Sequence, residues 1–416
     1  MKKSVFTVVL CFLVSLSFGQ KKAVSAAENE IKSNPPNFKE ARNLIKDALT
    51  NPETANDAKT WYVAGQIENK QFDTERALQI LGKQPNEEAM YNALENILPY
   101  FEKAAALDQL PDEKGKVKPK FLKDIRSNIR ANRPFYINAG LYAYDKKDYQ
   151  KAYENFKLHG DIPNMDIFKD EKWVIAKGDT NEMQIRYYAG LAAALIPNHQ
   201  ASIAMFDQLK NDGYVSNTVF KESDLYSNLA REYYQIGDTV NYEKFLKDGF
   251  AKFPEEAFFL QNLINLNMHS EKYAEAASLL NKAISMYPDS AQYYFTISQV
   301  YDADKKTDEA VKNMKKAVEL EPKNMDYLSE MGRLYFNLGV EKRSAADSNS
   351  DANQSKALSQ QSQDYFKAAM PYFEKVFEAD NKNSKAIYAL RSIYYNLSMN
   401  AQYEKMDALY TKETGQ

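Results

Sequence analysis

Three histidines and one cysteine are the residues of this 416-residue chain whose types most often carry catalysis or bind metal ions. They are His159, His199, His269 and Cys11, and no histidine lies in H-E-x-x-H or another zinc-binding spacing. The sequence also lacks a G-x-S-x-G nucleophile motif, a phosphate-binding loop and a dinucleotide-binding fingerprint, and it holds only 14 glycines. We therefore expect no enzyme activity, no catalytic residues and no metal site.

The 57 acidic residues provide many carboxylate pairs, but pairs are inevitable at that number and predict no acid–base site without a cleft that holds them. One run, residues 347–353, has oxygen-bearing side chains at alternate positions, as a calcium-binding loop has. It lacks the glycine at the sixth position of such loops and has Leu358 where the twelfth ligand should be. We interpret the run as a flexible insertion and expect no cofactor.

Pro254, Pro288 and Pro322 mark a repeat of 34 residues. This repeat predicts the structural elements that would position any binding residues. Within residues 291–324, apolar and small side chains recur at spacings of three and four, which is one face of a helix. Two such sets follow one another: Tyr294, Ile297, Ser298 and Tyr301, then Ala310, Met314 and Ala317. A polar segment separates them, and a proline cannot continue the second helix. Each block therefore predicts a pair of helices joined by a turn.

This skeleton resembles the tetratricopeptide repeat, W-x2-L-G-x2-Y, then A-x3-F, then P. Blocks 223–256 and 257–290 match in phase, and the next block opens with Leu328, Met331-Gly332 and Tyr335. Weaker units lie upstream, for example around Trp61 with Ala64-Gly65. The resemblance implies an all-α fold, a right-handed α-solenoid of about eight or nine stacked helix-turn-helix repeats.

The repeats divide the chain into segments. We expect a signal peptide over residues 1–19, degenerate repeats over 20–222, regular repeats over 223–335, the second half of a repeat over 336–383 and capping helices over 384–416. Insertions are expected near 71–97 and 340–364, each as extended helices joined by a loop. Pro99 and Pro371 begin near-identical segments that we interpret as openings of second helices. Residues 167–180 are a third irregular stretch, expected to be a short extended excursion or a hairpin.

The first residues have the layout of a secretory signal peptide. Met1-Lys-Lys precedes an apolar run, and Ser17 and Gly19 are small residues before a cleavage point that leaves Gln20 first. The alternative is a membrane anchor, but the run is shorter than a span of about 20 residues. Cys11 lies inside the run without the small residues that lipidation requires before it. We expect export, and a periplasmic or secreted protein whose mature chain has no transmembrane span.

The charge of the chain is mildly acidic. Its formal net charge is −3, and loss of the signal peptide would leave −5. That balance provides no electrostatic basis for binding nucleic acid. The one basic run, Lys114, Lys116, Lys118 and Lys120, lies in a connector that contains Pro and Gly, and we interpret it as a solvated loop rather than a binding patch.

In the family that this chain resembles, first-helix positions 2, 5, 9 and 12 of each repeat line a concave groove. Carried over, these positions predict a partner-binding groove of amide, aromatic and arginine side chains: Arg231, Tyr234, Phe258, Gln261, Asn265, Gln292, Phe295, Gln299, Arg333 and Phe336. The carboxylate clamp of chaperone-binding family members is not matched, since Asp326 and Glu330 stand where it needs basic residues.

The leading hypothesis is a non-catalytic scaffold of the bacterial cell envelope that binds partner proteins or extended peptides in this groove. The alternative is a glycan-binding surface or periplasmic protein, because amides can bind glycan hydroxyls and aromatic rings provide rigid contact area. An enzyme whose site lies in the insertions is a third and weaker hypothesis, because the catalytic motifs are missing.

Overall fold

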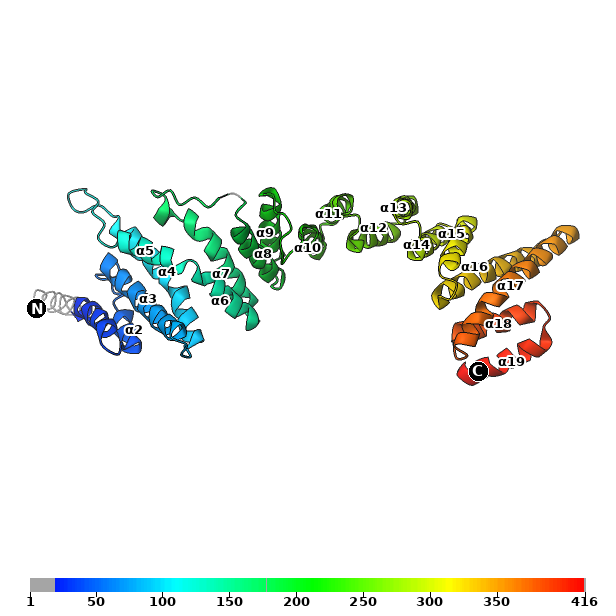
Figure 1. The fold of residues 1–416 in the computed structure, drawn as a ribbon, viewed down its shortest axis with the longest axis horizontal. Coiled ribbons are helices and arrows are strands. Elements are labelled where there is room, and N and C mark those ends of the chain that lie inside the picture. Colours follow the sequence, from blue (N-terminus) through cyan, green and yellow to red (C-terminus); the bar gives the residue numbers. More distant parts are fainter. Residues whose placement is uncertain (1–18, 177, 415–416) are drawn as a thin grey trace, which may run out of the picture. The chain divides into compact units, whose positions relative to one another are not determined.

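A computed structural model describes residues 19–176 and 178–414, so the predicted signal peptide lies, apart from Gly19, outside the described residues. The described residues form helices and connecting loops and contain no β-strand. Within each of two compact units, neighbouring helices pack as antiparallel hairpins that stack one after another (Figure 1). This arrangement confirms the predicted all-α solenoid. The chain divides into two compact units, one ending at Phe245 and the other spanning Leu246–Gln416.

The N-terminal unit begins with helical residues 19–32, which pair with the first numbered helix, α2. Its elements in order are α2 (Phe38–Lys46), α3 (Ala58–Ile80), α4 (Glu87–Asp108), α5 (Leu122–Asn132), α6 (Phe135–Asp145), α7 (Tyr149–Asp161), the 3₁₀ turns η1 (Ile162–Asn164) and η2 (Asp166–Phe168), α8 (Thr180–Ala194), α9 (His199–Asn211) and α10 (Glu222–Gln235). The next helix, α11 (Thr239–Lys252), runs across the division between the units.

The C-terminal unit consists of four further hairpins. Their helices are α12 (Ala257–His269), α13 (Tyr273–Met286), α14 (Ala291–Ala303), α15 (Thr307–Leu320), α16 (Met325–Asp347), α17 (Ala352–Ala379), α18 (Ser384–Asn396) and α19 (Asn400–Thr414). The helices α11, α13 and α15 end two residues before Pro254, Pro288 and Pro322, respectively. The prolines therefore stop the second helix of each repeat, as predicted.

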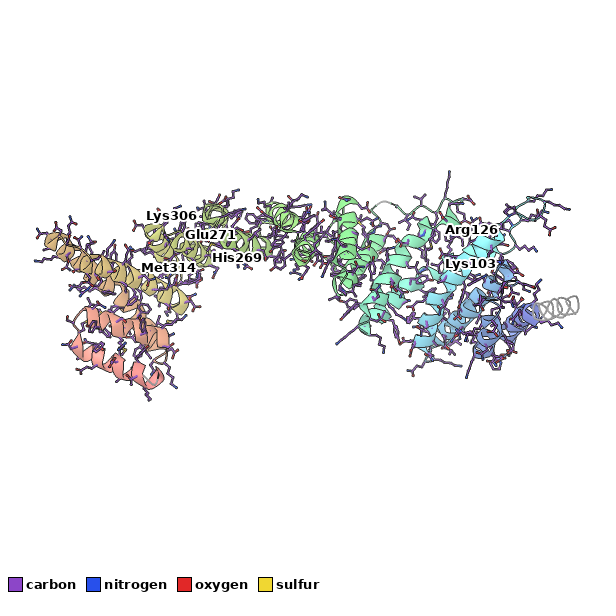
Figure 2. All side chains as sticks on the ribbon, turned by 180° about the vertical axis from the view of Figure 1, so that it is seen from behind. Lys103, Arg126, His269, Glu271, Lys306 and Met314 are labelled. Carbon is purple, nitrogen blue, oxygen red and sulfur yellow. The ribbon has the colours of Figure 1, made fainter. Side chains whose placement is uncertain are left out.

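The turns inside several hairpins use one residue in the left-handed conformation. At the end of α14, Lys305 has φ 58°, its N–H donates to Asp302 O, and Lys306 N–H donates to Tyr301 O. These two bonds are the Schellman arrangement, which satisfies the last carbonyls of the helix. Glu271, labelled with His269 in Figure 2, closes α12 in the same way with φ 55°. The same short turn therefore folds both helix pairs back on themselves.

Glycine sets the distance between the two helices of several hairpins. A Cβ atom on Gly65 would lie 2.3 Å from Phe101 Cδ1, and one on Gly140 would lie 2.5 Å from Phe156 Cε1. Atoms do not approach so closely, so the aromatic ring of the second helix needs the bare backbone of the first. Equivalent contacts join Gly190 to Phe206, Gly332 to Phe373 and Gly339 to Phe366. These rings and their neighbours form the core between the helices.

Both predicted insertions are long helical hairpins. The first is α3 with α4, and the second is α16 with α17, where Ser362 Oγ donates to Gly339 O at 2.7 Å. One expectation about them is wrong: Pro99 and Pro371 lie inside α4 and α17, which begin at Glu87 and Ala352. Buried side chains on both sides of each proline, Leu94 and Phe101 around Pro99 for example, hold the helix together across the missing N–H.

The third irregular stretch contains the turn η2 and then, over residues 169–176, neither helix nor strand. Trp173 fixes it to the N-terminal unit. Its ring meets the Phe168 ring edge-on, with centroids 4.9 Å apart, and the Arg130 guanidinium lies 4.7 Å from its centroid. In the part that the structure describes, this stretch is an irregular excursion packed on the core rather than a hairpin.

Candidate functional site

Two predicted groove residues of α14, Gln292 and Phe295, contact Tyr327 of α16, which the groove prediction did not include. The Phe295 ring stacks on the Tyr327 ring with centroids 4.9 Å apart, and Tyr327 Oη donates to Gln292 Oε1 at 3.2 Å. Gln292 and Gln299 are exposed, whereas Phe295 is half-buried. This face of α14 therefore presents an aromatic platform beside two side-chain amides.

Arg333 lies on α16, also at the junction with α14. Its guanidinium pairs with Glu330 at 2.7 Å on its own helix and with Asp302 at 2.6 Å on α14. The hydrogen bond to Glu330 contributes most to raising the pKa of Arg333, and Asp302 adds to it while burial opposes it. Two carboxylates thus surround one guanidinium, so this face offers no uncompensated cation for an anionic ligand.

The other residues predicted for the groove are placed separately. Gln261 and Asn265 are exposed on α12, and the half-buried Phe258 contacts the ring of Phe259. Phe336 on α16 packs against the buried Phe366 ring, with centroids 5.6 Å apart, so much of its ring belongs to the α16–α17 core. These contacts do not gather the three α12 residues with those of α14 and α16.

Arg231 and Tyr234 lie on α10 in the N-terminal unit. Both are exposed, and the Tyr234 ring contacts the Tyr242 ring, with centroids 5.1 Å apart. The groove predicted from the repeat positions therefore draws residues from both compact units, and only the α14–α16 part has a geometry that the contacts above define.

The histidines have structural partners. His159 Nδ1 donates to Arg133 O at 3.0 Å and its Nε2 lies 3.3 Å from Glu182 Oε1, while Arg133 donates to Glu182 Oε2 at 2.6 Å. Burial raises the pKa of Glu182, but the hydrogen bonds from His159 and Arg133 outweigh it and lower that pKa to about 2. The network ties α7, α8 and the α5–α6 junction together. His199 pairs with Glu232, and His269 Nδ1 donates to Asn265 O.

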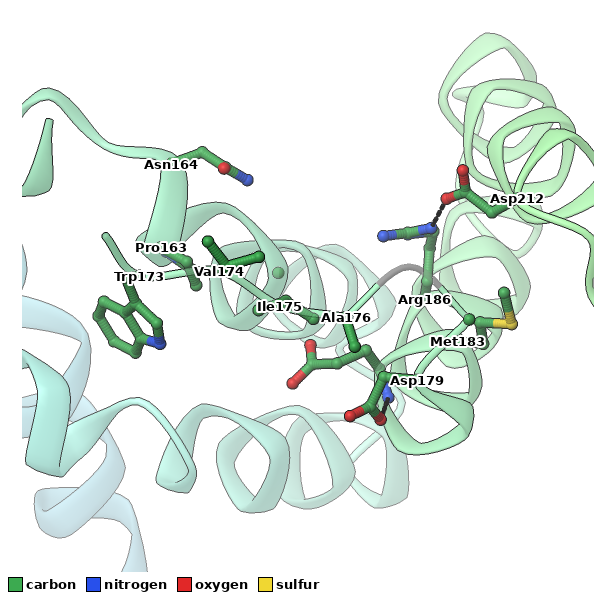
Figure 3. Close-up of a pocket in the computed structure, with 13 residues that line it drawn as sticks. Pro163, Asn164, Trp173, Val174, Ile175, Ala176, Asp179, Met183, Arg186 and Asp212 are labelled. Carbon is green, nitrogen blue, oxygen red and sulfur yellow. Dashed lines mark hydrogen bonds and ion pairs between the residues drawn. The ribbon is translucent and has the colours of Figure 1, made fainter. Parts of the chain in front are cut away.

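A cavity of about 380 Å³ lies beside this network, between the irregular excursion and α8 (Figure 3). Trp173 and Val174 form one side, and the Arg186–Asp212 ion pair, 2.6 Å long, forms the other. The lining includes Ala176 and Gly178, and residue 177 between them in the sequence lies outside the described residues, so we assign no ligand to the cavity.

Across residues 19–176 and 178–414, no three His, Cys, Asp or Glu side chains are grouped so that they could hold a metal ion. Within the same residues, no helix has the length and apolar character needed to cross a bilayer.

Comparison with known proteins identifies the repeats. The family model described as tetratricopeptide repeat matches residues 291–324 and 350–383. The chain contains tetratricopeptide repeats. A search of curated proteins found no match.

A search of solved structures also found matches over part of the chain, three of which follow. The MamA protein is 20% identical, with 47% of this chain and 94% of MamA covered and a TM-score of 0.33. The C-terminal part of a TPR repeat-containing protein from Cytophaga hutchinsonii is 12% identical, with 67% and 95% covered and a TM-score of 0.45. MamA from Desulfovibrio magneticus RS-1 is 15% identical, with 50% and 99% covered and a TM-score of 0.34.

The prediction from sequence missed two exposed aromatic residues. Tyr388 and Tyr395 on α18 occupy positions 5 and 12 of the repeat that begins at Ser384. The signal was present, since Ile387, Leu390 and Tyr394 carry the apolar pattern of that repeat and are buried. Extending the same positions by one more block would have found both tyrosines.

Proposed function

We propose that this chain is a non-catalytic scaffold of the bacterial cell envelope that binds partner proteins or extended peptides through the first helices of its tetratricopeptide repeats. The observation that supports it best is the α14–α16 face, where the stacked Phe295 and Tyr327 rings lie beside the exposed amides of Gln292 and Gln299. An extended peptide has unpaired backbone N–H and C=O groups, and side-chain amides can satisfy both. The aromatic pair supplies rigid contact area.

The charges of this face favour some partners over others. Asp302 and Glu330 share the single guanidinium of Arg333, which leaves one net negative charge at the junction of α14 and α16. A peptide carboxylate or phosphate would be repelled there, whereas neutral or basic segments are compatible. The partner class that fits this geometry is a neutral or basic extended segment.

Export is the second part of the proposal and rests on the sequence of residues 1–19. A basic start, an apolar run and small residues before Gln20 are the three parts of a cleavable signal peptide. Amino-terminal sequencing of the protein purified from a periplasmic fraction should begin at Gln20. A chain that keeps Met1 and remains in the cytoplasmic fraction would contradict export and the envelope location.

The binding proposal is tested by photo-crosslinking in intact cells. A photoreactive p-benzoylphenylalanine replaces Gln299 on the predicted binding face, and a matched variant carries it at Lys312, whose side chain is 78% exposed on the second helix α15. We expect a discrete crosslinked partner from the Gln299 position and none from the Lys312 position. Equal products from both positions, or none from either in cells with abundant folded protein, would contradict binding through this face.

Glycan binding is the second candidate, because the exposed amides beside the Phe295–Tyr327 pair can also bind sugar hydroxyls. A panel of envelope polysaccharides tests it with the purified chain. Binding that Phe295→Ala or Phe336→Ala removes would favour a glycan over a protein partner. Circular dichroism must accompany the Phe336→Ala variant, because that ring also packs on Phe366.

A further inference from the structure

Four tyrosines form a surface on the last hairpin that the groove prediction did not include. Tyr388 and Tyr395 on α18 are 50% and 70% exposed. Tyr403 and Tyr410 on α19 lie opposite them: the rings of Tyr395 and Tyr403 have centroids 5.7 Å apart, and those of Tyr388 and Tyr410 have centroids 6.1 Å apart. We call these four residues the tyrosine ladder.

An ion pair separates the two ring pairs of the ladder. Arg391 Nε donates to Asp407 Oδ1 at 2.5 Å, which joins α18 to α19 midway between the rings. The Arg391 guanidinium lies 4.9 Å from the centroid of Tyr410 and 5.8 Å from that of Tyr403. The Tyr403 and Tyr410 rings are therefore held in place by a charged contact on their own hairpin, and the Tyr388 and Tyr395 rings pack against them, so a ligand would meet a surface that is already ordered.

The opposite face of α18 is occupied by the core. Leu390 and Ile393 are fully buried in a cluster with Phe373 and Val376 of α17, and Ile387 is fully buried as well. The ladder residues of α18 thus point away from the packed interior. At least half of each ring is exposed, so its apolar area is not used for packing within the hairpin. Tyrosine combines such area with a polar tip, and this is why it is enriched at binding surfaces.

We propose that the tyrosine ladder binds a proline-rich segment of a partner protein in the polyproline II conformation. Seven residues separate Tyr388 from Tyr395, which is about 10.5 Å along the helix at 1.5 Å per residue. A polyproline II helix advances about 9.3 Å per three-residue turn. Prolines one turn apart can therefore each contact one ring pair, as prolines do in other aromatic-lined grooves.

The hydrogen-bonding groups of the ladder fit the same ligand. A polyproline II backbone has carbonyl acceptors that no internal hydrogen bond uses, and its prolines have no N–H. The Tyr388 and Tyr395 hydroxyls can donate to such carbonyls, whereas the Tyr403 hydroxyl already donates to Asp407 Oδ1 at 3.4 Å. A glycan would instead need side-chain amides or carboxylates for its hydroxyls, and the carboxylate between the two ring pairs, that of Asp407, already accepts from Arg391 and Tyr403. The proposal rests on the proposed function, since α18 is a first helix of the same repeats, but the decaproline test can fail while the crosslink from Gln299 succeeds, so the two failures are distinguishable.

The test uses the full purified chain and a fluorescently labelled decaproline peptide, with binding followed by anisotropy. We expect saturable binding that Tyr388→Ala and Tyr395→Ala each weaken about tenfold, the effect typical of an aromatic hot spot. Tyr395→Phe should retain most of the affinity, because it keeps the ring. Tyr287→Ala is the matched control, since this tyrosine is 40% exposed at the end of the second helix α13 and belongs to neither the predicted groove nor the ladder, and it should leave binding unchanged.

Four results would overturn the proposal. The first is that decaproline shows no saturable binding up to millimolar concentration and gives the same anisotropy signal as a Gly-Ser peptide of the same length. The second is binding that survives both alanine substitutions in chains whose helical content is unchanged. The third is concentration-dependent self-association that the Tyr395→Ala variant abolishes while decaproline has no effect, because the ladder would then contact a second copy of the chain. Binding of a polysaccharide through the same two tyrosines, without decaproline binding, would likewise replace the proposal by a glycan site.

Discussion

Replacing Gly65 by Ala should destabilise the N-terminal unit, although alanine is the better helix former. Gly65 lies inside α3, where its missing side chain admits the fully buried ring of Phe101 from α4. An added Cβ would lie 2.3 and 2.4 Å from two ring carbons. Overpacking of this kind costs about 1–3 kcal/mol, and the short distances place this site at the upper end. Helix propensity returns about 1 kcal/mol, so the net loss is about 2 kcal/mol.

Gly160→Ala is the matched control for this prediction. Gly160 also lies in a helix, α7, but nothing is within 4 Å of the Cβ that it would gain. Without a clash, only helix propensity changes, and the variant should be stabilised by up to about 1 kcal/mol. The two alanine variants therefore differ in the sign of their effect as well as in its size.

The assay is urea unfolding followed by tryptophan fluorescence. Both tryptophans of the chain, Trp61 and Trp173, lie in the N-terminal unit, so the signal reports the unit that is perturbed. A fluorescence transition of Gly65→Ala that is unchanged, or that moves to higher urea as the Gly160→Ala transition should, would refute the close-approach argument.

A second substitution tests whether the ring is the cause. Ser298 and Met314, both fully buried, occupy the positions equivalent to Gly65 and Phe101 in a regular repeat, so a small side chain and methionine are compatible there. Methionine is unbranched and can bend away from a neighbour. Phe101→Met should therefore recover about 1 kcal/mol in the Gly65→Ala background relative to additivity. Strict additivity of the two substitutions would place the cost of Gly65→Ala somewhere other than this contact.

Three further predictions concern a turn, a titrating group and a loop. Lys305→Gly should raise the stability of the C-terminal unit by about 0.5–1 kcal/mol, because Lys305 has φ 58° and glycine adopts that conformation without steric cost. Lys305→Gln removes only the charge. It should therefore cause little change in the urea midpoint of unfolding, measured by circular dichroism. Glu182 has its pKa lowered to about 2 from 4.5, so its contribution to stability is present above about pH 4.5 and is lost as the pH falls toward 2. Glu182→Gln should remove part of this acid dependence, and a pH profile with the same slope as the parent would contradict the assignment. The Asp108 carboxylate accepts the backbone N–H groups of Lys120, Phe121 and Leu122, so Asp108→Ala should cost about 1–3 kcal/mol and accelerate hydrogen exchange at residues 120–122. Exchange rates that do not change there would show that the loop is ordered without it.

The regular repeats were predictable because their information is local. A helix pair of fixed length with a proline after it leaves the same spacing of small and apolar residues in every block, and α12 to α15 follow that spacing. Helix starts inside the two insertions were not predictable in this way. Pro99 was expected to open a helix, yet α4 continues through it, because packing on both sides of the proline stabilises the helix and sequence spacing does not report that packing.

Some residues depart from the repeat signature, and only the side chains that they pair with in the structure explain why they are there. Glu68 stands where the family has an aromatic residue, and its buried carboxylate pairs with Arg42, 26 residues away. Arg186 holds another such position and pairs with Asp212. A single chain gives no indication of which distant charge will compensate such a replacement. The groove residues have a similar limit: the periodicity places them on first helices, whereas their charge state, as at Arg333, depends on neighbours.

The last hairpin also has a charged residue in place of a residue of the repeat signature. The position is the one that holds a glycine in other hairpins and sets the distance between their two helices. Arg391 and Asp407 are sixteen residues apart, as are Gly140 and Phe156, and Gly190 and Phe206. In those two hairpins a ring fills the space over a glycine, whereas in α18 and α19 an ion pair, partly exposed to water, takes that place. An exposed ion pair contributes little to stability, so packing alone does not explain its presence there. It does contact the rings of Tyr403 and Tyr410, against which the exposed rings of Tyr388 and Tyr395 lie, and such positioning is what a preorganised binding site requires.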